Sequence, residues 1–207
     1  TSIYTYLKMK NYAPGSKILI TGINIPTIPD IIHHFNLRCI AIDLNLNTLD
    51  MNLEDLSDKI EKEDIKCLIY SHLFGKINDI NYIIDLCKDK SIDFIEDCAE
   101  CFTQSYRGNP RSDMICFSFG SIKKCSCFGG SSTFLRNKDE YKKFESIIKK
   151  YKYQSTFSYI VKLVKYFFIS FLTNNKFINI FFRYVAYLLN ININDLFVKL
   201  IKNIPKE

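Results

Sequence analysis

The stretch Asp113–Gly130, which reads DMICFSFGSIKKCSCFGG, decides how this chain is interpreted. It begins as a short apolar and aromatic run bounded by Asp and Gly, which predicts a buried strand. It then breaks into a loop, presents Lys123 and Lys124, and ends in a glycine pair that allows close backbone approach. A lysine just after a buried strand, with Ser118 five residues before it, suits a covalent cofactor site. An amine can form a Schiff base with an aldehyde, and a hydroxyl can bond a phosphate.

The same residues allow a plainer interpretation. Consecutive lysines in a loop are usually solvated, and Gly-Gly usually forms a turn. Short motifs also have many false positives, so this stretch alone does not establish a site.

The rest of the chain predicts an α/β fold. Near-continuous apolar runs alternate with helical patterns, which is typical of a mainly parallel sheet covered by helices on both faces. The predicted strands are 17–21, 38–43, 65–71, 91–97, 114–119 and 131–135. The predicted helices are 3–9, 30–36, 52–63, 79–90 and 138–153, with Pro14-Gly15 ending the first and a loop at 22–29. We therefore expect a three-layer sandwich with a mainly parallel mixed sheet.

Polar residues follow three of the predicted strands. His72 follows the third strand, Asp97 ends the fourth, and Ser118 with Lys123 comes after the fifth. Ligands of such sheets bind at the carboxyl ends of the strands, so these residues are expected to converge there.

Charge and motifs exclude some classes of function. The net charge of +6 comes from the segment after residue 150, since eight basic and two acidic residues follow from Tyr151 onward. The first 150 residues are neutral and do not predict an electrostatic nucleic-acid binder. No strand is followed by a glycine-rich nucleotide-binding motif.

The eight cysteines predict reduced thiols. They are spread through predicted strands and helices, and we find no secretory signal, so we expect a cytoplasmic protein. Cys98-x-x-Cys101 and Cys125-x-Cys127 raise the question of zinc. The second pair has the wrong spacing and no histidine is near either pair in the sequence, so we expect no metal.

A carboxylate and a lysine on neighbouring strand ends suit pyridoxal 5'-phosphate. This cofactor needs an amine for its aldehyde, an anion beside its ring nitrogen and donors for its phosphate. An ionised Asp97 would keep the ring nitrogen protonated. The alternative is that Asp97 pairs with a lysine or caps the next loop, and at a strand end we expect its carboxylate to be more exposed than buried.

Three segments carry a family resemblance: Ile95–Glu100 (IEDCAE), Cys116–Lys123 (CFSFGSIK) and Gly129-Gly130. Together they resemble the pyridoxal-phosphate sugar aminotransferases of the DegT/DnrJ/StrS type. His72–Gly75 also falls in that family's order, and the resemblance covers residues 1 to about 150. It implies an aspartate-aminotransferase-like large domain, incomplete at its N-terminus.

The resemblance also implies roles for single residues. Lys123, rather than Lys124, is the lysine that forms the Schiff base with the cofactor and then acts as acid and base. Asp97 is the partner of the ring nitrogen, and Ser118 is a phosphate ligand.

Three further cofactor contacts follow from the same resemblance. Glu100 stands where the family usually has Gln, near the ring hydroxyl of the cofactor. Thr1 and Ser2 match a helix start that binds phosphate.

The function implied by the resemblance is amino transfer from an amino-acid donor, such as glutamate, to a keto-sugar-like acceptor, in polysaccharide biosynthesis. A homodimer is expected. The alternative is a degenerate or truncated relative that keeps the fold as a binding or structural module. We expect this chain to be a fragment, inactive by itself, with residues 151–207 leading to a missing C-terminal domain.

The C-terminal segment does not match that family. Residues 159–172 and 177–189 predict two apolar helices interrupted by Lys162, Lys165 and Arg183, and no run is apolar enough to span a membrane. We favour a helical hairpin packed on the protein or across a dimer. The alternative, that residues 157–189 touch a membrane surface, is not favoured.

Overall fold

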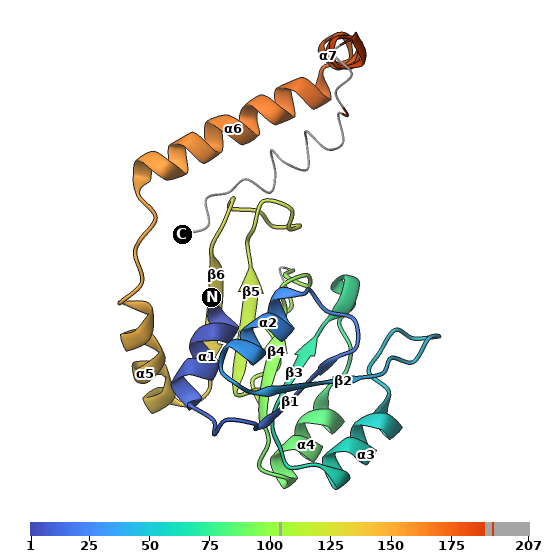
Figure 1. The fold of residues 1–207 in the computed structure, drawn as a ribbon, viewed down its shortest axis with the longest axis vertical. Helices are drawn as coiled ribbons and strands as arrows, with labels where there is room; N and C mark the ends of the chain where they lie inside the picture. Colours follow the sequence, from blue (N-terminus) through green and yellow to red (C-terminus); the bar gives the residue numbers. More distant parts are fainter. Residues whose placement is uncertain (104, 189–191, 193–207) are drawn as a thin grey trace. The chain divides into compact units, whose positions relative to one another are not determined.

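A six-stranded sheet forms the centre of residues 1–152 (Figure 1). The structure is a computed structural model and describes residues 1–103, 105–188 and 192. The strands lie in the order β2-β1-β3-β4-β5-β6, and all neighbours are parallel except β5 and β6. Their bounds are β1 Lys17–Thr21, β2 Arg38–Ile42, β3 Ile65–Ser71, β4 Asp93–Asp97, β5 Met114–Ser118 and β6 Ser131–Leu135.

Helices cover both faces of this sheet. Successive strand residues point to opposite faces, so Ile18 and Ile20 of β1 join one apolar core while Leu19 joins another. The first core is completed by α1, α2 and α5, and the second by α3 and α4. These helices are α1 Ser2–Lys10, α2 Thr27–His34, α3 Leu53–Lys62, α4 Asn81–Asp89 and α5 Lys138–Ile148. The predicted three-layer α/β sandwich with a mainly parallel mixed sheet is confirmed.

Element boundaries differ from prediction mainly at the helices. α1 ends at Lys10, before Pro14, because Asn11 adopts a left-handed conformation (φ 48°) that closes the helix. α2 begins at Thr27, inside the predicted loop, since the first turn of a helix tolerates a proline such as Pro29. The helix predicted over 138–153 is shorter, since α5 ends at Ile148.

The strand order creates a switch point beside β1. The chain passes from β1 to β2 on one side and then to β3 on the other side of β1. The connections therefore leave the carboxyl ends of β1 and β3 in opposite directions, which opens a crevice there. At the other end of the parallel set, β6 runs antiparallel, which brings Ser131 opposite Ser118.

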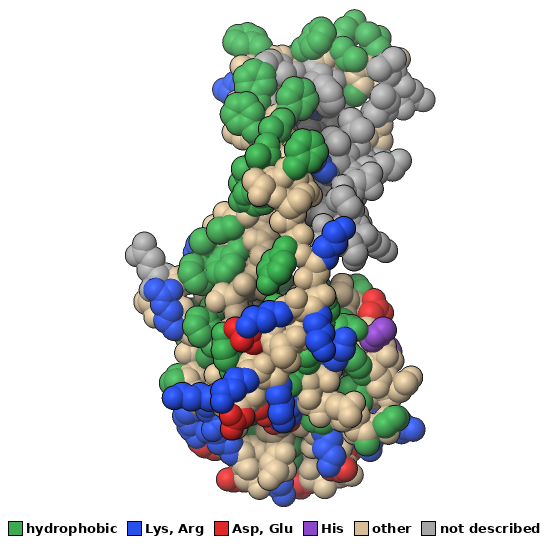
Figure 2. Space-filling view, turned by 90° about the vertical axis from the view of Figure 1, so that its left-hand side faces the viewer, with side chains coloured by type: hydrophobic (Ala, Val, Ile, Leu, Met, Phe, Trp, Pro, Cys, Tyr) green, Lys and Arg blue, Asp and Glu red, His purple; other side chains and the backbone are tan. Residues whose placement is uncertain are grey.

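Residues from Tyr153 onward form a second unit, with helices α6 (Thr156–Asn174) and α7 (Lys176–Leu188). Ser155 caps α6, because its side chain accepts a hydrogen bond from the Ser158 N–H at 3.1 Å. Many apolar side chains of this unit are exposed, and Figure 2 shows them in green. No described helix is long and apolar enough to cross a membrane. Both predicted helices are present, although residue 189 lies outside the described residues. The packing of a helical hairpin on the protein or across a dimer stays a prediction, and membrane contact by residues 157–189 stays the alternative that is not favoured.

Candidate active site

Two cavities lie at the carboxyl ends of the central strands. Their volumes are about 190 and 380 Å³, and both are lined by Ile25, Asp97, Ala99 and Lys123. The smaller cavity continues along the segments after β1 and β3, and the larger one reaches the start of α1 and the first residue of β6. Both therefore lie at the sheet edge where open α/β folds bind ligands.

Asp97, the last residue of β4, is buried, with 9% of its surface exposed. Its Oδ1 accepts hydrogen bonds from the Ala99 N–H (3.0 Å) and the Cys116 thiol (3.7 Å), and its Oδ2 accepts one from the Ser71 hydroxyl (3.4 Å). Burial raises the pKa of Asp97, while these bonds and the charge of Lys123 oppose the rise. The expectation of an exposed carboxylate is wrong, because the neighbouring strands β3 and β5 cover it. The bond to Ala99 does cap the next loop.

Lys123 lies in the loop between β5 and β6. Its N–H donates to the Gly120 carbonyl at 3.0 Å, which forms a tight turn at the strand end. The Lys123 side chain is 23% exposed, and its Nζ lies 3.8 Å from Glu100 Oε1. Lys124 is exposed and lines neither cavity. Only the first of the two lysines therefore shares a cavity wall with Asp97.

Hydroxyl groups surround the far end of the larger cavity. They belong to Thr1, Ser2, Thr27, Ser118 and Ser131. Ser2 Oγ lies 3.2 Å from Ser131 Oγ and accepts a hydrogen bond from Thr133 Oγ1 at 2.8 Å. The side chain of Thr1 makes no capping hydrogen bond to α1. The first N–H groups of this helix thus stay available to an anion, which the helix dipole also favours.

Glu100 lies at the rim of the smaller cavity. Its Oε2 accepts a hydrogen bond from the Phe74 N–H at 3.0 Å, and its side chain is 51% exposed. Phe74 and Gly75 both have positive φ angles, 56° and 75°. A Cβ at Gly75 would lie 2.9 Å from the Glu100 carbonyl oxygen, so a glycine is required there. The turn after His72 therefore holds the Glu100 carboxylate on the Lys123 side.

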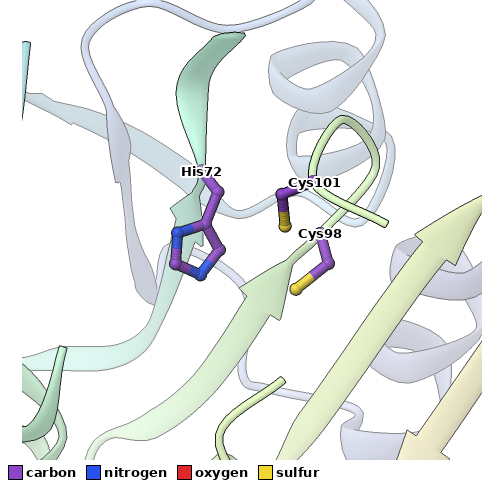
Figure 3. Close-up of side chains that lie close together, drawn as sticks. All are labelled: His72, Cys98 and Cys101. Atoms are coloured by element: carbon purple, nitrogen blue, oxygen red, sulfur yellow. The ribbon is translucent and has the colours of Figure 1, made fainter. Parts of the chain in front are cut away.

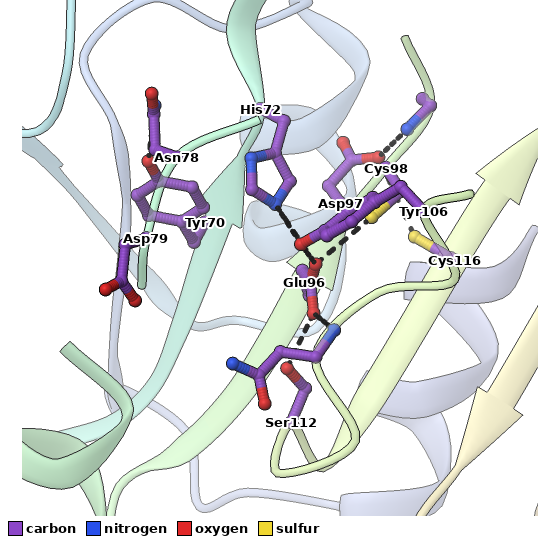
Figure 4. Close-up of polar contacts among 12 residues, drawn as sticks. Tyr70, His72, Asn78, Asp79, Glu96, Asp97, Cys98, Tyr106, Ser112 and Cys116 are labelled. Atoms are coloured by element: carbon purple, nitrogen blue, oxygen red, sulfur yellow. Dashed lines mark hydrogen bonds and ion pairs between the residues drawn. The ribbon is translucent and has the colours of Figure 1, made fainter. Parts of the chain in front are cut away.

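Sequence reasoning missed Glu96, the residue before Asp97. It is fully buried on the opposite face of β4 and accepts five hydrogen bonds (Figure 4). Its Oε1 is bonded by His72 Nε2 (3.0 Å), Cys98 Sγ (3.3 Å) and the Tyr106 hydroxyl, and its Oε2 by Asn109 N (2.8 Å) and Ser112 Oγ (2.7 Å). Burial acts to raise the pKa of Glu96, but these hydrogen bonds, led by those of His72 and Tyr106, hold the pKa below its ordinary value.

His72 lines the smaller cavity together with Asp97 and Lys123, as expected for the residue that follows β3. Although it lines the smaller cavity, its imidazole bonds Glu96. A ring nitrogen of His72 and the Sγ atoms of Cys98 and Cys101 lie within 4.8 Å of one another (Figure 3). The sequence argument that no histidine is near the Cys-x-x-Cys pair is therefore wrong in space. It failed because β3 and β4 are neighbours, so the residues after them meet.

Comparisons of the sequence place the chain among aminotransferases. The model of the DegT/DnrJ/EryC1/StrS aminotransferase family matches residues 1–159. A GDP-perosamine synthase from Escherichia coli O157:H7 is 27% identical over 118 residues, which is 57% of this chain and 31% of that protein. A UDP-2-acetamido-2-deoxy-3-oxo-D-glucuronate aminotransferase from Pseudomonas aeruginosa is 25% identical over 130 residues, 61% of this chain and 36% of that protein. The chain thus spans about a third of the length of these relatives.

Solved structures share the fold. A putative PLP-dependent aminotransferase from Bacillus cereus matches with a TM-score of 0.61 and 19% identity, over 69% of this chain and 40% of that one. The sugar aminotransferase CalS13 from Micromonospora echinospora matches with a TM-score of 0.59 and 24% identity, over 69% and 41%. At these identities the similarity shows the architecture alone.

Proposed function

Because the chain belongs to the DegT/DnrJ/EryC1/StrS aminotransferase family, we propose that the protein binds pyridoxal 5'-phosphate and transfers an amino group from an amino acid to a keto-sugar-like acceptor. The names of the two relatives above support a sugar as the acceptor class. The chain spans only part of those proteins, so the proposed activity is that of the whole protein. Glutamate is the donor to test first.

One observation carries this proposal: a buried carboxylate and a lysine line the same two cavities. The donors that bond Asp97 are a backbone N–H, a thiol and a hydroxyl, all of them neutral. A buried carboxylate without a full counter-charge is matched by a protonated ring nitrogen, because ligand cation and protein anion then neutralise each other. Asp97 therefore fits the ring side of the cofactor.

The larger cavity fits the phosphate side. Its hydroxyl groups, together with the uncapped start of α1, provide donors, and Asp97 is the only carboxylate among its described lining residues. Ser118 makes no side-chain hydrogen bond within the described part of the chain, so its hydroxyl is available. A phosphate at the start of α1 would gain both hydrogen bonds and the favourable end of the helix dipole.

The chain's own residues then have separate tasks. When bound, the cofactor supplies an aldehyde and an electron-accepting ring. Lys123 would hold it through the aldehyde and would carry a proton at Nζ to and from the substrate carbon. Asp97 would keep a proton on the ring nitrogen. Glu100, 3.8 Å from Lys123 Nζ, would keep the amine oriented toward the cavity.

The first test is chemical fixation of the cofactor. The protein is loaded with pyridoxal phosphate, reduced with borohydride, digested and analysed by mass spectrometry. We expect one adduct, on Lys123, with Lys123→Ala losing it and the matched variant Lys124→Ala keeping it. An adduct on Lys124, or none, contradicts the assignment.

The second test is a half-reaction. The loaded full-length protein is mixed with glutamate, and 2-oxoglutarate is measured together with the absorption spectrum of the bound cofactor. One equivalent of 2-oxoglutarate per site supports amino transfer. No release across a panel of amino donors would favour a binding module that has kept the fold without the reaction.

A further inference from the structure

A cluster of four ligand-type side chains lies on the face of β4 opposite Asp97. His72 directly follows β3, Glu96 belongs to β4, and Cys98 and Cys101 follow β4 (Figures 3 and 4). All four are buried, with no more than 2% of their surface exposed. We propose that His72, Glu96, Cys98 and Cys101 bind one zinc ion.

Two distances between donor atoms, those from Glu96 Oε1 to His72 Nε2 and to Cys98 Sγ, are close to those of a tetrahedral zinc site. With metal–ligand distances of about 2.0–2.3 Å, tetrahedral angles put N···O at roughly 3.4 Å and S···O at roughly 3.6 Å. Here His72 Nε2 lies 3.0 Å and Cys98 Sγ lies 3.3 Å from the same oxygen, Glu96 Oε1. Shifts of less than about half an ångström would bring these donors to the zinc geometry. The two thiols and a ring nitrogen already lie within 4.8 Å of one another.

The donor types favour zinc over other metals. Two thiolates, an imidazole and a carboxylate are all zinc ligands, and Cys98-x-x-Cys101 has the spacing of many structural zinc sites. Four protein donors leave no open position, which is typical of a structural site rather than a catalytic one. Glu96, Cys98 and Cys101 line neither cavity, and only the fourth ligand, His72, borders the smaller one. The zinc proposal does not rest on the proposed function.

Binding of the zinc ion is accompanied by the release of two protons, one from each thiol. The Cys98 and Cys101 thiols each lose a proton to solvent and bind as thiolates. The proton on His72 Nε2 moves to Nδ1, which is buried and has no hydrogen-bond partner among the described residues. Glu96 binds as the carboxylate and keeps the hydrogen bonds that Asn109 and Ser112 donate to its Oε2.

The ion would fix the loop that carries the cofactor-side residues. Ala99, which donates to Asp97, and Glu100, which faces Lys123, both lie between the two cysteines. Joining Cys98 and Cys101 to His72 through one metal would restrict this loop at both ends. The zinc would therefore stabilise the loop from the face that the substrate does not reach.

The test is a titration of the reduced, metal-free protein with Co²⁺, followed by Zn²⁺. We expect one equivalent of Co²⁺ to give the thiolate charge-transfer band and the intense visible bands of a tetrahedral site, and Zn²⁺ to remove both. Loss of a residue that only supports a metal ligand typically weakens metal binding by about 10–100-fold. Cys98→Ser and Cys101→Ser each remove a direct ligand, so each should weaken Co²⁺ binding by at least that much. The matched control is the double variant Cys125→Ser/Cys127→Ser, which alters the two exposed cysteines and should bind normally.

A second measurement covers variants that fail to fold. The wild-type protein is alkylated with and without Zn²⁺, and each cysteine is quantified by mass spectrometry after digestion. Zinc should protect Cys98 and Cys101 and leave Cys125 unaffected. Absence of stoichiometric Co²⁺ binding, a spectrum without thiolate bands, or loss of the signal in the Cys125/Cys127 variant would each overturn the proposal.

Discussion

Glu96 and Asp97 are adjacent carboxylates on one strand, and they have opposite environments. Glu96 accepts five hydrogen bonds and its pKa is held low, whereas Asp97 has three neutral donors and a pKa raised by burial. Because successive strand residues point to opposite faces, one side chain meets the loop after β4 and the other meets the cavities. The difference teaches that burial alone does not identify a functional carboxylate.

What separates the two is how completely the protein satisfies each charge. The Glu96 carboxylate is fully compensated from within the chain and joins β3, β4 and the loop that leads to β5. The Asp97 carboxylate is incompletely compensated and lines a space that a ligand can fill. Pairs of acids whose pKa values are pushed apart are a general sign of divided roles.

The largest effect should come from removing the compensated carboxylate. Glu96→Ala leaves buried donors of His72, Asn109 and Ser112 without an acceptor, so we expect a loss of about 3–5 kcal/mol in the free energy of unfolding. Urea denaturation of the cofactor-free protein measures it. The matched control is Glu61→Ala, an exposed glutamate, which should change stability by less than about 0.5 kcal/mol. Equal effects of both variants would refute the distinction.

We expect substitution of Asp97 to have the opposite effect on stability. In Asp97→Asn the amide oxygen can still accept from Ala99 and Cys116, and the amide nitrogen can donate to the Ser71 hydroxyl. The buried charge disappears, so the cofactor-free protein should gain about 0.5–2 kcal/mol of stability. Amino transfer should fall sharply, since a neutral amide does not hold a proton on the ring nitrogen. Normal turnover in this variant would remove Asp97 from the site.

The two carboxylates should also give opposite dependences of stability on pH. Because the pKa of Glu96 is lower in the folded protein, the Glu96 carboxylate stabilises the fold at pH values above 4.5, its pKa in the unfolded chain. This stabilisation is lost as the pH falls below that value. The raised pKa of Asp97 means that its charged form destabilises the protein at neutral pH, and that this penalty disappears as the pH falls toward 3.8.

Unfolding curves of three proteins test this directly. As the pH falls below about 4.5, the stability advantage of wild type over Glu96→Gln should shrink. Between pH 7 and about 4, its stability disadvantage against Asp97→Asn should shrink. Differences that stay constant with pH would show that neither carboxylate titrates as argued.

The smallest effect should be at Glu100, whose half-exposed side chain is screened by solvent. Glu100→Gln should change the free energy of unfolding by less than about 0.5 kcal/mol and should leave cofactor binding intact, because the amide oxygen can still accept from the Phe74 N–H. Glu100→Ala removes that acceptor, so the free energy of unfolding of this variant should be about 0.5–1 kcal/mol lower than that of Glu100→Gln. Loss of cofactor binding in Glu100→Gln would show that the negative charge of Glu100 itself contributes to cofactor binding.

The strand bounds could be predicted from the sequence better than the contacts of the side chains at the carboxyl ends of the strands. Local apolar runs were enough for β1 and β3, whose bounds match the prediction. The positions of Asp97 and Lys123 at one sheet edge followed from the rule that parallel strands end on the same side. The partners of Glu96 could not be predicted, since Tyr106, Asn109 and Ser112 lie in an irregular segment with no periodic pattern. The alternation of side chains along a strand is the one sequence signal that could have placed Glu96 on the face opposite Asp97.

The contact between α1 and β6 has a consequence for how the protein is made. Ser2 meets Ser131 and Thr133, and Lys10 pairs with Glu140 at 2.9 Å, so the first helix is held by the last elements of its unit. During synthesis α1 emerges before β6 and α5 and must wait for about 130 further residues before these partners exist. Contacts of such long sequence separation form slowly. The wall of the larger cavity is therefore among the last parts to assemble, and a nascent chain that stops before β6 lacks the Ser131 side of that cavity.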